Sequence, residues 1–294
     1  MNQMTTPNLN GAARSAPASL ATIGMRSIPT DLCQLAVYDT GLPMNPAAPD
    51  DVLVFWPSIL ADHHIFDAQV AALRQRHRLI LIDGPGHGAS GAPGAAFSME
   101  QCAQAQAQVL EALKISQPVV SVGTSWGGLV AGEFALRYPR QTRAVVMLNA
   151  PVFTSRARLQ DRFVTFGSRW LNRTNVYVQG VEEGYFMPET RKRDTKFMEQ
   201  FSRHIKTADA AAMSVSVRSV LLARADLASR LQDIAAPTLF VAGTHDKLCP
   251  IDDQRRAAAK LPHGHFVELP TAHIAVVDAP VESTRAIDDF LGGL

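Results

Sequence analysis

Short apolar runs alternate with longer, helix-like stretches along most of the chain after residue 51. The runs are rich in Val, Leu and Ile and do not alternate with polar residues, which is typical of strands buried on both faces of a sheet. Six runs are of this kind: residues 52–56, 79–83, 119–123, 144–149, 237–243 and 265–269. The pattern predicts an α/β fold in which a mostly parallel sheet is covered by helices.

Five stretches between and after these runs are predicted helices: residues 64–76, 98–114, 126–138, 252–260 and 280–291. Ser98 is expected to cap the second of them, with the Gln101 side chain reaching back to the backbone of the cap. An additional pair of strands is expected at residues 24–28 and 33–38, before the first crossover connection.

The regular alternation stops between residues 151 and 236. This segment holds nine of the chain's 20 aromatic residues: Phe153, Phe163, Phe166, Trp170, Tyr177, Tyr185, Phe186, Phe197 and Phe201. Aromatic residues gathered outside the sheet strands indicate a helical lid with an apolar underside. We therefore predict a disordered tail at residues 1–19, a core formed by residues 20–150 and 237–294, and an inserted helical lid at residues 151–236.

The charge balance narrows the class of partner. The chain has 294 residues and a formal net charge of +1, from 28 basic and 27 acidic residues. Because the charges nearly cancel, the chain lacks the excess of basic residues that is typical of proteins that bind DNA or RNA. We therefore expect a small-molecule partner and no nucleic acid. The sequence makes no prediction of oligomeric state.

Three cysteines, Cys33, Cys102 and Cys249, lie far apart and form no C-x-x-C pair. Neither a disulfide framework nor a zinc site is predicted, and a reducing, cytoplasmic compartment fits best. No apolar run approaches the roughly 18 residues needed to cross a bilayer, so no membrane partner is expected. The N-terminus lacks the features of a secretion signal but is poor in acidic residues, which leaves a transit peptide as the alternative to a disordered tail.

The candidate nucleophile is Ser125, within Gly123-Thr124-Ser125-Trp126-Gly127. This matches the G-x-S-x-G nucleophile elbow, a pattern that chance alone produces in roughly one chain in ten of this length. Context decides in its favour, because the motif follows an apolar run and opens a predicted helix, as the elbow requires. The flanking glycines relieve crowding at the strained turn, and the helix aims its N-terminal amides at the site.

Asp246 and His273 are the candidate acid and base. A serine hydroxyl needs a base to take its proton, and elbow-type hydrolases follow the chain order Ser, Asp or Glu, His. Both residues come directly after apolar runs, where open α/β sheets place their ligands.

The other histidines and acidic residues near the strand ends are weaker candidates for the base and the acid. His263 and His265 precede the last strand, His245 neighbours Asp246, and Asp252 and Asp253 are expected to start a helix. Asn149 ends a strand at the other place where an acid can stand, but an amide cannot serve as the acid.

Three further histidines lie near predicted strand ends. His87 belongs to a tight turn that Asp83 and Ser90 are expected to tie down through side-chain hydrogen bonds. His63 and His64 follow the first long strand, and either face the mouth of the pocket as substrate-binding residues or merely start the next helix. No metal and no cofactor are predicted.

Over residues 35–294 the sequence resembles the lid-bearing α/β-hydrolases. Within that family it is similar to the 3-oxoadipate enol-lactonases in Ser58-Ile59-Leu60-Ala61-Asp62, followed by Phe66-Asp67-Ala68-Gln69. Further similarity lies in Gly243-Thr244-His245-Asp246 with Pro250, and in Ala272-His273 with Asp278-Ala279-Pro280. The resemblance implies the α/β-hydrolase fold and a serine triad.

Two departures bear on the substrate. At the oxyanion loop, the common His-Gly pair is replaced by Trp56-Pro57-Ser58, and the Ser-Leu-Gly of the enol-lactonases is replaced by Ser58-Ile59-Leu60. In the segment between residues 151 and 236, those enzymes have a basic and aromatic substrate motif, whereas this sequence has Gly184-Tyr185-Phe186. The resemblance therefore carries over fold, triad and hydrolase chemistry only. Tyr185 and Phe186 are predicted to contact the substrate.

The predicted reaction is acyl transfer to Ser125 from an ester or lactone, with His273 as base and Asp246 orienting it. The oxyanion is expected to bind the backbone N–H of Trp126 and that of Ile59 or Leu60. The alternatives on the same framework are a cofactor-free haloperoxidase, a carbon–carbon bond hydrolase and a non-catalytic receptor. A serine at the elbow disfavours the dehalogenases and epoxide hydrolases, which use aspartate as nucleophile.

Overall fold

A computed structural model describes residues 23–45, 51–154 and 159–294. Its centre is an eight-stranded sheet in the order β1-β2-β4-β3-β5-β6-β7-β8. The strands are β1 (Met25–Pro29), β2 (Gln34–Asp39), β3 (Val52–Trp56), β4 (Arg78–Ile82), β5 (Val119–Thr124), β6 (Thr142–Leu148), β7 (Thr238–Gly243) and β8 (Gly264–Leu269). Strands β1 and β2 are antiparallel to their neighbours, and β4, β3, β5, β6, β7 and β8 run parallel.

The central strands are mainly apolar because both faces of the sheet are covered. Every residue of β3, β5 and β7 is buried. The core helices are α1 (Asp67–Leu73), α2 (Met99–Ala112), α3 (Trp126–Arg137), α9 (Ile251–Ala258), α10 (Ala275–Asp278) and α11 (Pro280–Gly292). Helix α1 packs against α11 and α2 against α3, so the predicted α/β architecture is confirmed.

The predicted strands and helices all have counterparts in the structure, with one difference in type. The helix expected at residues 64–76 begins as a 3-10 turn, η2 (His63–Phe66), before α1. Asp62 caps this turn, since its side chain accepts a hydrogen bond from the backbone N–H of His64 at 3.1 Å. The expected cap of α2 is confirmed, because Ser98 and Gln101 form the reciprocal pair of bonds. Short 3-10 turns also occur at η3 (Pro139–Gln141) and η4 (Leu231–Asp233).

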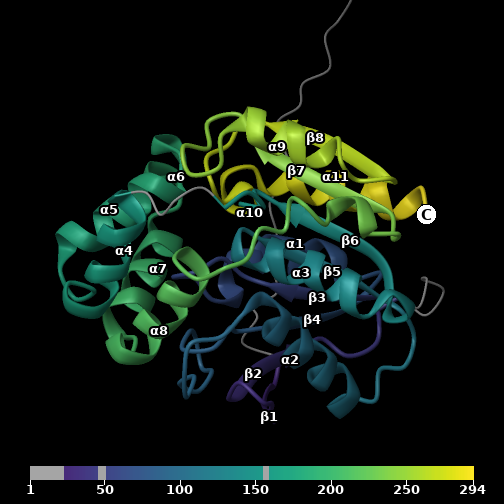
Figure 1. Cartoon of the computed structure of the whole chain (residues 1–294), viewed down its shortest axis with the longest axis horizontal. Coiled ribbons are helices and arrows are strands. Elements are labelled where there is room, and N and C mark those ends of the chain that lie inside the picture. Colours follow the sequence, from purple (N-terminus) through teal and green to yellow (C-terminus); the bar gives the residue numbers. More distant parts are fainter. Residues whose placement is uncertain (1–22, 46–50, 155–158) are drawn as a thin grey trace, which may run out of the picture.

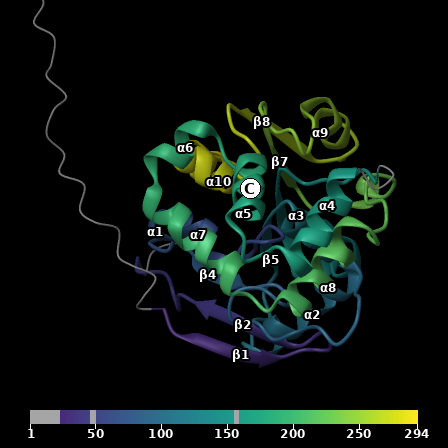
Figure 2. The ribbon, with the colours of Figure 1, turned by 90° about the vertical axis from the view of Figure 1, so that its left-hand side faces the viewer.

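Five helices lie between β6 and β7: α4 (Leu159–Trp170), α5 (Asn175–Tyr185), α6 (Pro188–Arg193), α7 (Thr195–Thr207) and α8 (Ala210–Leu221). They form a separate group beside the sheet, at the left of Figure 1 and facing the viewer in Figure 2. The predicted tail at residues 1–19 lies outside the described residues. The division into core and lid stays a prediction.

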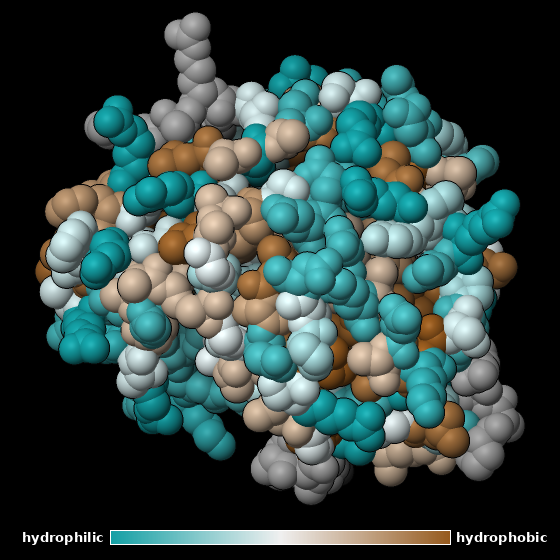
Figure 3. Space-filling model, turned by 60° about the horizontal axis from the view of Figure 1, so that its bottom comes forward, coloured by the Kyte–Doolittle hydropathy of each residue, from teal (hydrophilic) through white to brown (hydrophobic). Residues whose placement is uncertain are grey.

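The hydropathy of the molecular surface is mixed across one face of the protein. On the face shown in Figure 3, hydrophilic and hydrophobic side chains are interspersed. Among the described residues, no helix is both long and apolar enough to cross a membrane.

Candidate active site

Ser125, Asp246 and His273 come together at the carboxyl ends of three parallel strands of the sheet. Ser125 follows β5, Asp246 follows β7 and His273 follows β8. The Nε2 atom of His273 lies 2.8 Å from Ser125 Oγ, and its Nδ1 atom lies 2.9 Å from Asp246 Oδ2. All three residues are buried. This continuous chain of hydrogen bonds can move a proton from the serine hydroxyl to the imidazole.

The turn that presents Ser125 is strained. Its backbone has φ 54° and ψ −110°, outside the usual region for a residue with a side chain. A Cβ on Gly123 would overlap the Gly127 backbone, and a Cβ on Gly127 would overlap the Trp56 carbonyl. The two glycines therefore allow β5 to turn sharply into α3, which holds the hydroxyl above the sheet.

Asp246 is held ionised by hydrogen bonds on both oxygens. Oδ1 accepts the backbone N–H groups of Leu248 and Cys249, each at 2.9 Å, and Oδ2 accepts from the side-chain amide of Asn149 at 3.0 Å as well as from His273. Burial alone would raise the pKa of this carboxyl, but His273 and these donors lower it below its usual value. The hydrogen bond from Asn149 was not predicted from the sequence, although the place of this residue at the end of β6, next to β7, is the signal that could have found it.

Two backbone N–H groups beside Ser125 are available to an oxyanion. Trp126 is the first residue of α3, whose leading amides have no partner within the helix. Within the described part of the chain, the N–H groups of Trp126 and Ile59 make no hydrogen bond, whereas that of Leu60 donates to His87 Nε2 at 3.0 Å. The geometry therefore favours Ile59 over Leu60 as the second donor.

A cavity of about 120 Å³ opens onto Ser125 and His273. Most of its wall is apolar and comes from both the core and the segment between β6 and β7. Its apolar lining includes Ile59, Leu60, Val152, Phe153, Val164, Val181, Leu221 and Leu248. Asp161, Arg224, Asp253 and Gln254 add polar groups to the wall. Such a space suits a small, mainly apolar group bound next to the serine.

A family model for the alpha/beta hydrolase fold matches residues 51–280. The chain belongs to the α/β-hydrolase family. It is 24% identical over 237 residues to 3-oxoadipate enol-lactonase 2 of Acinetobacter baylyi, covering 80% of this chain and 86% of that protein. It is 28% identical over 254 residues to the pimeloyl-[acyl-carrier protein] methyl ester esterase of Xylella fastidiosa, covering 78% of this chain and 91% of that protein.

Solved structures of the same fold are also similar. The enol-lactonase from Burkholderia xenovorans superposes with a TM-score of 0.80 at 22% identity, covering 88% of this chain and 97% of that one. A thermophilic esterase from Thermogutta terrifontis superposes with a TM-score of 0.82 at 22% identity, covering 92% of this chain and 98% of that one. The fold class, the family resemblance and the expectation of a hydrolase-family enzyme are confirmed.

Of the predicted substrate contacts, Tyr185 lines the cavity of this α/β-hydrolase and Phe186 does not. The Tyr185 hydroxyl donates to the Ile59 carbonyl at 2.7 Å and so ties α5 to the loop after β3. Phe186 instead packs edge-on against Phe197 and Phe201, with ring centroids 5.7 and 5.0 Å away. This aromatic cluster sets the direction of its ring, so Phe186 lies outside the cavity wall, and its contact with substrate stays a prediction.

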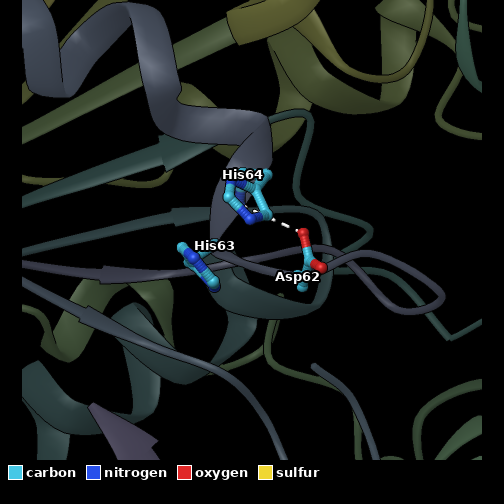
Figure 4. Close-up of side chains that lie close together, drawn as sticks. All are labelled: Asp62, His63 and His64. Atoms are coloured by element: carbon cyan, nitrogen blue, oxygen red, sulfur yellow. Dashed lines mark hydrogen bonds between the residues drawn. The ribbon is translucent and has the colours of Figure 1, made fainter. Parts of the chain in front are cut away.

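His63 and His64 also lie away from the cavity wall. His63 is buried, stacks on Tyr38 and pairs through Nδ1 with Asp83 at 2.9 Å. His64 pairs through Nδ1 with Asp67 at 3.2 Å, and its backbone N–H donates to the Asp62 side chain (Figure 4). The buried Asp83 carboxylate holds the His63 ring, and neither histidine lines the cavity. Both lie in η2, so the alternative, that the pair starts the next helix, fits.

His87 holds the oxyanion loop in place. The turn around it is tied as expected, since Asp83 accepts from the Ala89 N–H and Ser90 donates to the Asp83 carbonyl. Its ring Nδ1 lies 2.9 Å from the Pro85 carbonyl, so Nδ1 carries the proton and Nε2 accepts from Leu60. Burial lowers the pKa of His87 to about 4, which keeps this acceptor available at neutral pH. Leu60 has φ 60°, a conformation that costs energy without such a bond.

We expect His87→Asn and His87→Gln to behave differently. Glutamine can keep an acceptor near the position of Nε2, whereas asparagine reaches only as far as Nδ1 and leaves the Leu60 N–H unpaired. His87→Asn should lower kcat by about 10- to 100-fold through a displaced oxyanion donor, and His87→Gln by less. Steady-state kcat and KM on a short ester check this. Equal losses in the two variants, matched by equal losses of Tm, would show that the ring only fills space.

Proposed function

We propose that this protein hydrolyses a carboxylic ester or lactone of a small molecule through an acyl-enzyme on Ser125. His273 takes the serine proton as Oγ attacks the carbonyl carbon, and Asp246 stabilises the charged imidazole. The tetrahedral oxyanion binds the N–H groups of Trp126 and Ile59. His273 then returns the proton to the leaving oxygen, and water activated by the same ring releases the acid.

The observation that carries the proposal is the hydrogen-bonded series from Ser125 through His273 to Asp246 at the base of an apolar cavity. The enol-lactonase and methyl ester esterase names of two relatives support an oxygen ester as the bond that is cleaved. The apolar wall supports a small acyl or alkyl group next to the carbonyl.

Substrate turnover and covalent labelling test the proposal together. The purified protein should hydrolyse a short p-nitrophenyl ester faster than it cleaves a β-diketone, and a fluorophosphonate probe should label Ser125. Cleavage of the diketone alone would favour a carbon–carbon bond hydrolase, and halogenation with peroxide would favour a haloperoxidase. A protein that neither labels nor turns over would be a receptor that keeps the shape of the fold.

The segment between β6 and β7 is proposed to act as a lid that sets acyl-chain preference. Val181 of α5 lines the cavity, so Val181→Phe should fill part of it. Each methylene that the ring excludes removes about 0.8 kcal/mol of burial, about fourfold in rate. We expect kcat/KM for octanoate esters to fall about tenfold or more, with little change for acetate. Rates across esters from acetate to octanoate measure this.

Val176→Phe on the same helix is the matched control. Val176 is 76% exposed, so its enlargement should leave the whole series unchanged. A uniform loss across all esters in Val181→Phe, with a lower Tm, would mean that Val181 supports the fold and does not select substrate.

A further inference from the structure

A second cluster of polar side chains lies at the turn between β3 and η2. Asp62, His63 and His64 each offer one metal-ligating atom, and these atoms all lie within 4.8 Å of one another (Figure 4). The cluster is separate from Ser125, Asp246 and His273. The sequence does not predict a metal here, because two adjacent histidines lack the usual spacing of ligands and the supporting side chains are far away in the chain.

Both imidazoles are oriented by a carboxylate. His63 Nδ1 lies 2.9 Å from Asp83 Oδ1, and His64 Nδ1 lies 3.2 Å from Asp67 Oδ1. Metal-binding histidines in proteins commonly use this arrangement, because a carboxylate on one ring nitrogen fixes the tautomer and leaves the other nitrogen as a ligand. Nε2 of each ring is therefore the atom with a free lone pair.

The cluster is rich in negative charge and has no strong cation of its own. Among the described residues, the ion pairs of Asp62, Asp67 and Asp83 are all with histidines, and none is with Lys or Arg. The carboxylates of Asp62, Asp67 and Asp83 therefore create a negative field around the two imidazoles. The same field attracts a metal cation.

The segment between β6 and β7 contributes to the cluster. His204 of α7 places Nδ1 3.3 Å from Asp62 Oδ2, while its Nε2 is buried without a partner. The Asp62 carboxylate is therefore fixed from two sides, by the His64 backbone N–H and by α7. The side chain of His64 is 30% exposed, which gives an ion and its water ligand a route to the cluster.

We propose that Asp62, His63 and His64 bind a divalent transition-metal ion of the zinc type. Two imidazole nitrogens and a carboxylate oxygen, completed by water, form a donor set that Zn²⁺ accepts and that Ca²⁺ and Mg²⁺, which prefer oxygen, do not. Asp62 directly follows the loop of Ile59 and Leu60, and His204 belongs to α7. The ion therefore lies beside the Asp62–His204 pair, which joins the loop after β3 to α7.

Calorimetric titration of the metal-stripped full chain with Zn²⁺ tests the site. We expect one ion per chain and a rise in Tm on binding. His64→Ala should weaken binding about tenfold or more, and Asp67→Asn, which removes the orienting carboxylate, should weaken it by about 10- to 100-fold. His263→Asn, at an exposed histidine before β8, should bind as the unaltered protein does.

Asp246, Cys249 and His273 form the other group of potential ligands, so Cys249→Ala is titrated in parallel. Cobalt(II) adds a spectroscopic readout, since a thiolate ligand gives an intense charge-transfer band that the proposed nitrogen and oxygen ligands lack. Loss of binding in Cys249→Ala but not in His64→Ala would overturn the proposal. So would the absence of any Zn²⁺ binding by the unaltered protein.

Discussion

Ser125→Ala is expected to remove measurable esterase activity and all fluorophosphonate labelling. Among the described residues, His273 Nε2 lies 2.8 Å from the Ser125 hydroxyl and contacts no second hydroxyl, so loss of this oxygen should prevent the acyl-enzyme from forming. The cost in stability should be small, about 1 kcal/mol, because one hydrogen bond is lost and the strained turn is kept. Ester turnover, intact-protein mass after labelling and Tm measure the three effects.

Ser229→Ala serves as the control for this experiment. Ser229 is an exposed serine whose hydroxyl donates to the Asp226 carbonyl, so its loss should change neither labelling nor rate. Persistent labelling of Ser125→Ala at another serine would contradict the assignment of the nucleophile. A large drop in Tm would instead indicate that activity was lost with the fold.

The sheet and the three residues at its edge were predictable because both follow from short-range rules. Apolar runs without polar alternation mark strands buried on two faces, and parallel strands bring their carboxyl ends to one edge. Ser125, Asp246 and His273 each follow such a run directly, so their meeting required only the correct strand assignment. The reciprocal cap of α2 is equally local.

The side chains whose directions the sequence did not predict are held by partners that are distant in the sequence. His63 turns toward Asp83, which stands 20 residues away in another turn, and Phe186 turns toward Phe197 and Phe201 of α7. A one-dimensional pattern places such residues near a site but does not give the direction of the side chain. The choice between Ile59 and Leu60 as oxyanion donor was open for the same reason, since the Leu60 N–H donates to His87, which belongs to the turn after β4.

Asp246→Asn is expected to lower kcat by about 10³- to 10⁴-fold with little change in KM. The Oδ1 atom of Asp246 accepts two backbone N–H groups, so an asparagine would keep its oxygen there and turn its NH₂ toward His273. That NH₂ would also meet the donating amide of Asn149. His273 would relieve the conflict by presenting a lone pair at Nδ1, which moves the proton to Nε2. An imidazole protonated at Nε2 cannot accept the Ser125 proton.

Steady-state kinetics on a short ester, with Asp252→Asn as the control, decide the matter. Asp252 lies in the first turn of α9 and pairs with Arg255 at the surface, so its amide should leave kcat unchanged. If Asp252→Asn carries the loss instead, the acid stands one loop further along the chain. If Asp246→Asn lowers kcat only severalfold, the wrong tautomer is not formed. Neither the charge of Asp246 nor its hydrogen bond to Nδ1 would then be essential, because an uncharged amide in the same position would still allow the ring to act as base.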